Sequence, residues 1–254
     1  MLKNIWRFCV SIELCLGLLL CICVAMAVGS FSLKGDYAAA INAVPLLIWL
    51  REVPVGTSWW LWLTVVLLAL LVLNTILCSV ETLRFRWRRA GMMSLFAPQL
   101  IHAGFLLIVL AHLQSASGGY MQQLEVVEGM LARLPDGRPF GVAGLDVVMS
   151  PMGMPIRFSG ELATNPSNPA ERVTISPNHP WFSGGYGVYI KQAEGYPSKR
   201  ALLEIHREPG AGMALAGVLI FTLGNILLVY LRSRSKENGC MDVEGEQAAG
   251  QDFR

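Results

Sequence analysis

A histidine inside an apolar run is the residue of this chain most able to do chemistry. His102 lies within residues 96–116, a run long enough to cross a bilayer. An imidazole in hydrocarbon is costly unless it pairs with a polar group, lines a polar cavity or binds a metal. We therefore interpret His102 as a ligand or a proton carrier, with a structural histidine satisfied by a polar neighbour as the alternative.

Two asparagines in other apolar runs can be placed beside this histidine by counting residues. Asn74 precedes the end of its run by six residues, Asn225 does the same, and His102 follows the start of its own run by six. At about 1.5 Å per residue, all three lie about 9 Å from one face of the membrane. Either amide could orient the imidazole through its second nitrogen, or it could simply bond another helix.

The elements that carry these residues are predicted to be transmembrane helices. Hydrophobic residues make up 54% of the chain and charged residues only 15%. Four runs approach or exceed the roughly 18–20 apolar residues that span about 30 Å of hydrocarbon. They cover residues 11–28, 59–80, 96–116 and 211–231. The first run could be a cleaved signal, but Glu13 and its length favour a retained helix.

The positions of Lys and Arg set the orientation. Basic residues precede the first run, fill the segment between the second and third, and follow the fourth: Lys3, Arg7, Arg84, Arg86, Arg88, Arg89, Arg232, Arg234 and Lys236. These segments all fall on one side, which the positive-inside rule assigns to the cytoplasm. Both termini are then cytoplasmic, and residues 117–209 form an extracytoplasmic domain.

This domain is predicted to be small and rich in β-strands. It holds eight Lys or Arg and nine Asp or Glu, a balance that gives no indication of nucleic-acid binding. Alternating apolar stretches separated by Gly, Pro and Asn predict strands at 123–127, 145–149, 157–162, 187–192 and 201–206. A short interfacial helix is expected within 37–50, a fourth transmembrane helix over 210–232 and a disordered cytoplasmic tail over 233–254.

The remaining reactive side chains do not form a recognisable soluble-enzyme site. None of the six cysteines lies in the extracytoplasmic domain, and the chain has no C-x-x-C-H for covalent haem and no C-x-x-C for thiol exchange. Nucleotide-binding, serine-hydrolase and zinc-protease motifs are also missing. His112 is expected at the membrane interface, and His179 and His206 are expected to be surface or structural residues.

Four segments of the sequence resemble those of one family. They are Ser58-Trp59-Trp60 with Leu73-Asn74-Thr75-Ile76-Leu77-Cys78; Ile101-His102-Ala103-Gly104; Pro177-Asn178-His179-Pro180 with Gly187-Val188-Tyr189; and Arg207-Glu208-Pro209-Gly210 leading to Gly217 and Gly224. In this order they resemble the ResB-like family of cytochrome c biogenesis membrane proteins of System II. The extracytoplasmic domain is shorter than usual there, and Glu208 stands where Asp is more familiar.

The resemblance implies a subunit of a cytochrome c maturation complex in the bacterial inner membrane. It implies a partner of the CcsA/ResC type, a haem-handling membrane protein, and apocytochromes c with CxxCH motifs as the recipients of haem. By match, His102 would be an axial ligand of a haem b shared with that partner, with Asn74 and Asn225 beside it. The chain would then be an accessory subunit of a haem lyase complex, since it offers no bond-making residue of its own.

Two other classes of protein stay open. One is a subunit of a b-type haem or quinol electron-transfer complex that shares its haem with another chain. A bis-histidine haem within this chain is excluded, because only the third run contains histidine. The other is a structural membrane subunit without cofactor, in which His102 bonds Asn74 or Asn225.

Overall fold

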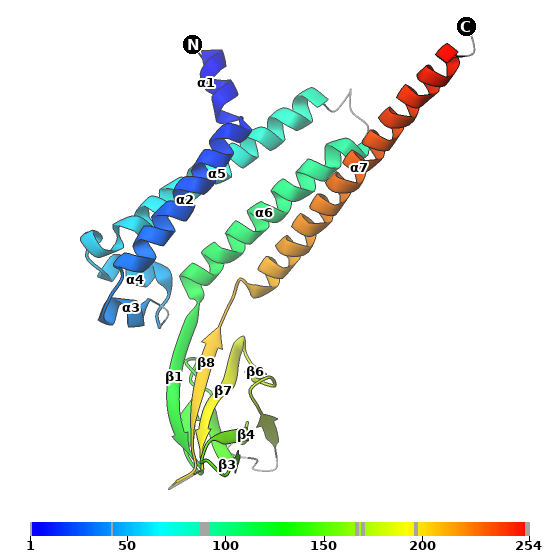
Figure 1. Cartoon of the computed structure of the whole chain (residues 1–254). Helices are drawn as coiled ribbons and strands as arrows, with labels where there is room; N and C mark the ends of the chain where they lie inside the picture. Colours follow the sequence, from blue (N-terminus) through cyan, green and yellow to red (C-terminus); the bar gives the residue numbers. More distant parts are fainter. Residues whose placement is uncertain are drawn as a thin grey trace. The chain divides into compact units, whose positions relative to one another are not determined.

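The structure is a computed structural model that describes residues 2–41, 43–86, 92–165, 168, 171–195 and 198–251. Four long helices dominate its helical unit (Figure 1): α2 (Ile12–Ser32), α5 (Val55–Arg86), α6 (Met92–Gly118) and α7 (Ala211–Gln251). A short helix, α1 (Leu2–Cys9), precedes them. All four long helices are apolar and long enough to cross a bilayer, and few of the side chains in their apolar windows are buried, as expected of lipid-facing helices. The prediction of a multi-pass membrane protein with four candidate spans is confirmed.

Each helix runs beyond the apolar window that predicted it. The second predicted span ended at Val80, whereas α5 continues to Arg86, because polar residues end an apolar window but do not end a helix. Similarly, α7 continues to Gln251, so the tail predicted to be disordered is helical in the described residues; no proline follows Leu231 to end the helix. Arg88 and Arg89 of the orientation argument lie outside the described residues.

Glycines bring the long helices together in pairs. A Cβ built on Gly29 of α2 would overlap the ring of Trp60 on α5, so the indole occupies the space that a side chain would need. On α6 and α7, Gly104 faces the backbone of Phe221 and Gly217, and Gly224 faces that of Ile101. Small residues of this kind let two backbones approach closely, which is how helices gain packing contacts where no hydrophobic effect drives them together.

The predicted interfacial helix forms as two shorter ones. They are α3 (Asp36–Ala40) and α4 (Leu46–Glu52), separated at Pro45. Proline has no N–H to donate and clashes with the preceding turn, so it stands at the start of α4 instead of inside a longer helix. Trp49 holds this segment together: it is buried and its indole N–H donates to the Tyr37 carbonyl at 3.2 Å.

The segment between α6 and α7 contains two four-stranded antiparallel sheets. One has the order β1-β8-β7-β6 and the other β2-β3-β4-β5. The strands are β1 (Tyr120–Val127), β2 (Leu131–Arg133), β3 (Pro139–Met149), β4 (Pro155–Ala163), β5 (Arg172–Ile175), β6 (Trp181–Ser183), β7 (Tyr186–Glu194) and β8 (Arg200–Arg207). Buried side chains from both sheets form one core that includes Phe140, Leu162, Val188 and Leu203. The predicted fold class, four membrane helices with a β-rich domain before the last, is confirmed.

Candidate functional site

His102 is held by a serine that the sequence analysis did not single out. Its Nδ1 lies 2.7 Å from the hydroxyl of Ser79 on α5. That hydroxyl in turn donates to the carbonyl of Thr75, one turn earlier in the same helix, at 2.9 Å. Ser79 has only one hydrogen to give, so toward the imidazole its oxygen acts as the acceptor.

These two hydrogen bonds favour one tautomer of His102. When the Ser79 hydroxyl donates to Thr75, Nδ1 carries the ring hydrogen and donates it to Ser79, which leaves the lone pair of a neutral imidazole on Nε2. Within the described part of the chain, Nε2 makes no hydrogen bond. An oriented imidazole with Nδ1–H satisfied and Nε2 available is the arrangement in which histidine ligates a metal.

Gln99 lies one turn before His102 on α6 and has an unsatisfied donor. Its side-chain nitrogen is buried without a hydrogen-bond partner among the described residues. Residues three apart on a helix share a face, so this amide and the imidazole lie near each other. A buried amide donor without an acceptor costs about 1–3 kcal/mol, and an incoming acceptor would recover that cost.

Asn74 bonds another helical segment, which is the second of the two roles considered for it from the sequence. Its amide donates to the carbonyl of Cys9 at 2.7 Å and to that of Ser11 at 3.4 Å, where the chain passes from α1 into α2. One turn later, the thiol of Cys78 donates to the carbonyl of Val10 at 3.2 Å. A break between helices leaves carbonyls such as those of Cys9 and Val10 without intrahelical partners. Asn74 therefore satisfies the backbone of the α1–α2 junction and does not contact His102.

Asn225 is close to the predicted level but also bonds elsewhere. Its neighbour Gly224 packs against Ile101, which places Asn225 near the level of His102. Its amide donates to the carbonyl of Phe221 in its own helix at 2.8 Å. The structure thus brings Ser79 to His102 and gives both asparagines other partners.

Substitution of Asn74 by leucine tests this structural role. Leucine has nearly the same shape but no donor, so the Cys9 carbonyl would lose its partner at a site where Asn74 is only 3% exposed. We expect the free energy of unfolding to fall by about 1–3 kcal/mol. Asn225→Leu is the matched control, because its amide bonds only within its own helix and its loss should cost much less. Equal destabilisation by the two substitutions, measured by thermal unfolding in detergent, would contradict the assignment.

The other histidines have different surroundings. His112 is exposed on α6, ten residues after His102, and His179 is exposed in a turn that is closed by a bridge to Ser176. His206 on β8 lies 3.1 Å from a carboxylate oxygen of Glu208. In the described parts of the chain, no three His, Cys, Asp or Glu side chains are grouped closely enough to hold a metal ion.

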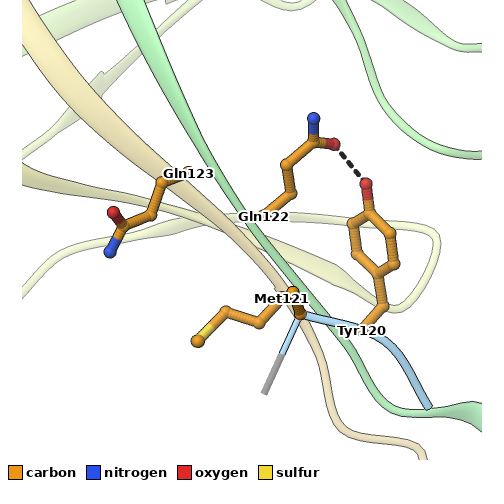
Figure 2. A pocket seen from close by; sticks show the side chains of 5 residues that line it. Tyr120, Met121, Gln122 and Gln123 are labelled. Carbon is orange, nitrogen blue, oxygen red and sulfur yellow. Dashed lines mark hydrogen bonds between the residues drawn. The ribbon is translucent and has the colours of Figure 1, made fainter. Parts of the chain in front are cut away.

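A hollow of about 410 Å³ in the β-rich unit is a weaker candidate. Ala43 lines it together with the start of β1, residues Tyr120, Met121, Gln122 and Gln123. Figure 2 shows the Tyr120 hydroxyl directed at the Gln122 amide oxygen, to which it donates. Burial, with a smaller contribution from Tyr186, raises the pKa of Tyr120, so this phenol stays protonated at neutral pH. Neutral amides and a neutral phenol offer no nucleophile or base.

Comparison with known proteins gives a distant structural likeness. No family model matches the chain, and no curated protein does. A solved structure named "Cytochrome c Heme Lyase CcmF" is similar to it, with a TM-score of 0.43 and 16% sequence identity. The match covers 85% of this chain and 34% of that one, so the chain spans about a third of its length.

Proposed function

We propose that this chain is a haem-handling membrane subunit of a cytochrome c maturation complex. In this proposal it binds haem b within the membrane through His102 and helps deliver it across the bilayer to CxxCH apocytochromes. The proposal joins the sequence resemblance to one observation. Hydrogen bonds from His102 to Ser79 and from Ser79 to Thr75 leave the imidazole Nε2 free to ligate.

The residues around His102 fit such a ligand. Haem iron accepts a neutral imidazole nitrogen, and in this arrangement Nε2 is the nitrogen on offer. The buried amide of Gln99, one turn away, can donate to an acceptor on a bound molecule, such as a carboxylate. Ser79 would hold the ring in one orientation by accepting from Nδ1.

The chain supplies one histidine to this site, so a second axial ligand would come from another protein. The proposed partner is a CcsA/ResC-type membrane protein, as the sequence resemblance implies. When bound, the haem supplies the vinyl groups and the iron that thioether formation requires. The role of this chain is to bind and orient it, since no pair of its described residues is arranged to form the bond.

The test is an absorption spectrum of the complex purified after co-expression of this chain with its partner. We expect the wild-type complex to carry a haem signal and His102→Gly to lose it, because the variant lacks the ligand. Imidazole added to the buffer should restore the signal by filling the space left by the side chain. His112→Gly, which removes an exposed histidine of the same helix, should leave the spectrum unchanged.

Two outcomes would overturn the axial role of His102. One is a full haem signal in His102→Gly, and the other is a lost signal that imidazole does not restore. Ser79→Ala separates positioning from ligation: we expect haem to be retained with a shifted spectrum and a shifted redox potential, since the hydrogen bond to Nδ1 tunes the basicity of the ligand. A purely structural Ser79 would change stability without moving either quantity.

A further inference from the structure

The turn between β3 and β4 is an exposed, uncharged and methionine-rich tip. Met149 ends β3, Met152 and Met154 lie in the turn, and Ile156 is the second residue of the return strand β4. Met152 is 87% exposed and Met154 62% exposed. A hairpin tip in water normally carries polar turn residues, so large apolar side chains here need an explanation.

Hydrogen bonds close this turn into a defined loop. The amide of Ser150 donates to the Met154 carbonyl at 2.7 Å, and the Met154 amide donates to the Ser150 hydroxyl at 3.0 Å. Gly153 takes a positive φ of 78°, which glycine adopts without strain. The three methionine backbones are therefore held at one end of the hairpin, while their side chains keep three rotatable bonds each.

The chemistry of the tip is that of soft, neutral sulfur. Between Asp146 and Glu161 the sequence has no Asp, Glu, His or Cys, so residues 147–160 offer thioethers but no carboxylate, imidazole or thiolate ligand. The sulfur of Met149 is not packed away in the core: it lies over Gly195, 3.7 Å from the position that a Cβ would take there. Hard ions such as Mg²⁺, Ca²⁺ and Mn²⁺ require oxygen ligands, and Zn²⁺ binds imidazole, thiolate or carboxylate. Thioether sulfur selects Cu(I) among the biological metals.

We infer that Met149, Met152 and Met154 form a binding site for a monovalent soft cation, Cu(I). The loop holds the backbones of three methionines at one turn, and their flexible side chains end in the sulfur type that Cu(I) prefers. The assignment is independent of haem binding at His102, because the hairpin belongs to the β-rich unit and His102 to the helical one. Binding transfers no electron and releases no proton, since thioethers are neutral.

The test uses the full chain in detergent, with its cysteines alkylated and its methionine methyl groups labelled with carbon-13. Alkylation removes the thiolates, which would otherwise compete for the metal. On titration with Cu(I), or with Ag(I) as a redox-inert substitute, we expect the methyl signals of Met149, Met152 and Met154 to shift together. The signal of Met121, in β1 of the same domain, should stay in place.

Leucine substitutions separate metal binding from a simple apolar contact. Met152→Leu and Met154→Leu keep the exposed apolar surface but remove a donor, so each should weaken Cu(I) binding by about tenfold or more. The triple variant with Met149→Leu should lose binding completely, while Met121→Leu should keep it. Unchanged melting temperatures would show that the variants are folded.

Two results would overturn the inference. The first is metal binding in the triple variant at wild-type strength. The second is the absence of shifts with metal when the same signals shift on addition of lipid vesicles. That pattern would show that the tip contacts a membrane surface instead.

Discussion

Gly217→Leu is expected to break the packing of α7 on α6. A Cβ at this position would come within 2.9 Å of the Ile108 side chain and 3.0 Å of the Ile108 amide and the Gly104 carbonyl. Two of these three neighbours are backbone atoms, which cannot move aside by a change of rotamer. Overpacking usually costs about 1–3 kcal/mol, and we expect this substitution to reach at least the upper end because the helices themselves must separate.

The same helix offers a matched control. A Cβ on Gly212 would meet nothing within 4 Å, so Gly212→Leu adds the same side chain to α7 without a collision. Thermal unfolding in detergent should show a large loss for Gly217→Leu and a small change for Gly212→Leu. If both variants unfold at the wild-type temperature, α6 and α7 do not pack through Gly104 and Gly217.

The packing of α7 on α6 at Gly217 also bears on the candidate site. His102 lies two residues before Gly104, whose own Cβ would lie 2.5 Å from the Phe221 amide. The face of α6 that carries Gly104 is therefore fixed against α7, and His102 is directed to Ser79 on α5. If the chain binds haem as proposed, we expect Gly217→Leu to disturb that binding as well as stability, since the register of α6 is set by this packing.

The sequence predicted the helices and longer strands, which depend on local composition. It missed the short strands and the contacts that depend on how the elements align with one another. The four helices follow from the lengths of their apolar runs, and the five longer strands follow from alternation. Strands β2, β5 and β6 were missed because three or four residues are too few to show a period of two. Pro45 was visible, yet its effect in dividing one predicted helix into two was not anticipated.

His102 shows the same limit at the site. Counting from the ends of the apolar runs paired it with Asn74, whereas the structure pairs it with Ser79, five residues or about 7 Å further along α5. The ends of the runs were set by where polar residues begin, while the helices continue past them. Ser79 did not stand out in the sequence as a partner of His102, because a serine that bonds its own helix is common in membrane spans. Its spacing of four from Thr75 was the only indication.

Phe140→Ala is expected to unfold the β-rich domain or nearly so. Phe140 lies on β3 with 0% of its surface exposed, and its ring centroid is 6.0 Å from that of Trp181 on β6 in the other sheet. Removal of a buried phenylalanine costs about 3–5 kcal/mol, the lost burial plus the cavity that remains. A domain of fewer than a hundred residues has little stability to lose, since folded domains are stable by only about 5–15 kcal/mol.

Limited proteolysis of the full chain can locate this damage. We expect Phe140→Ala to expose cleavage sites between β1 and β8 that are protected in the wild type, and Phe182→Ala to leave that protection intact because Phe182 is 67% exposed. Equal protection in both variants would mean that Phe140 is not central to the core. His102, Ser79 and Gln99 all belong to the helical unit, so the haem spectrum of Phe140→Ala addresses a separate question. A retained spectrum would place the proposed haem binding in the helices alone, whereas a lost one would require the β-rich domain to help hold the haem or the proposed partner.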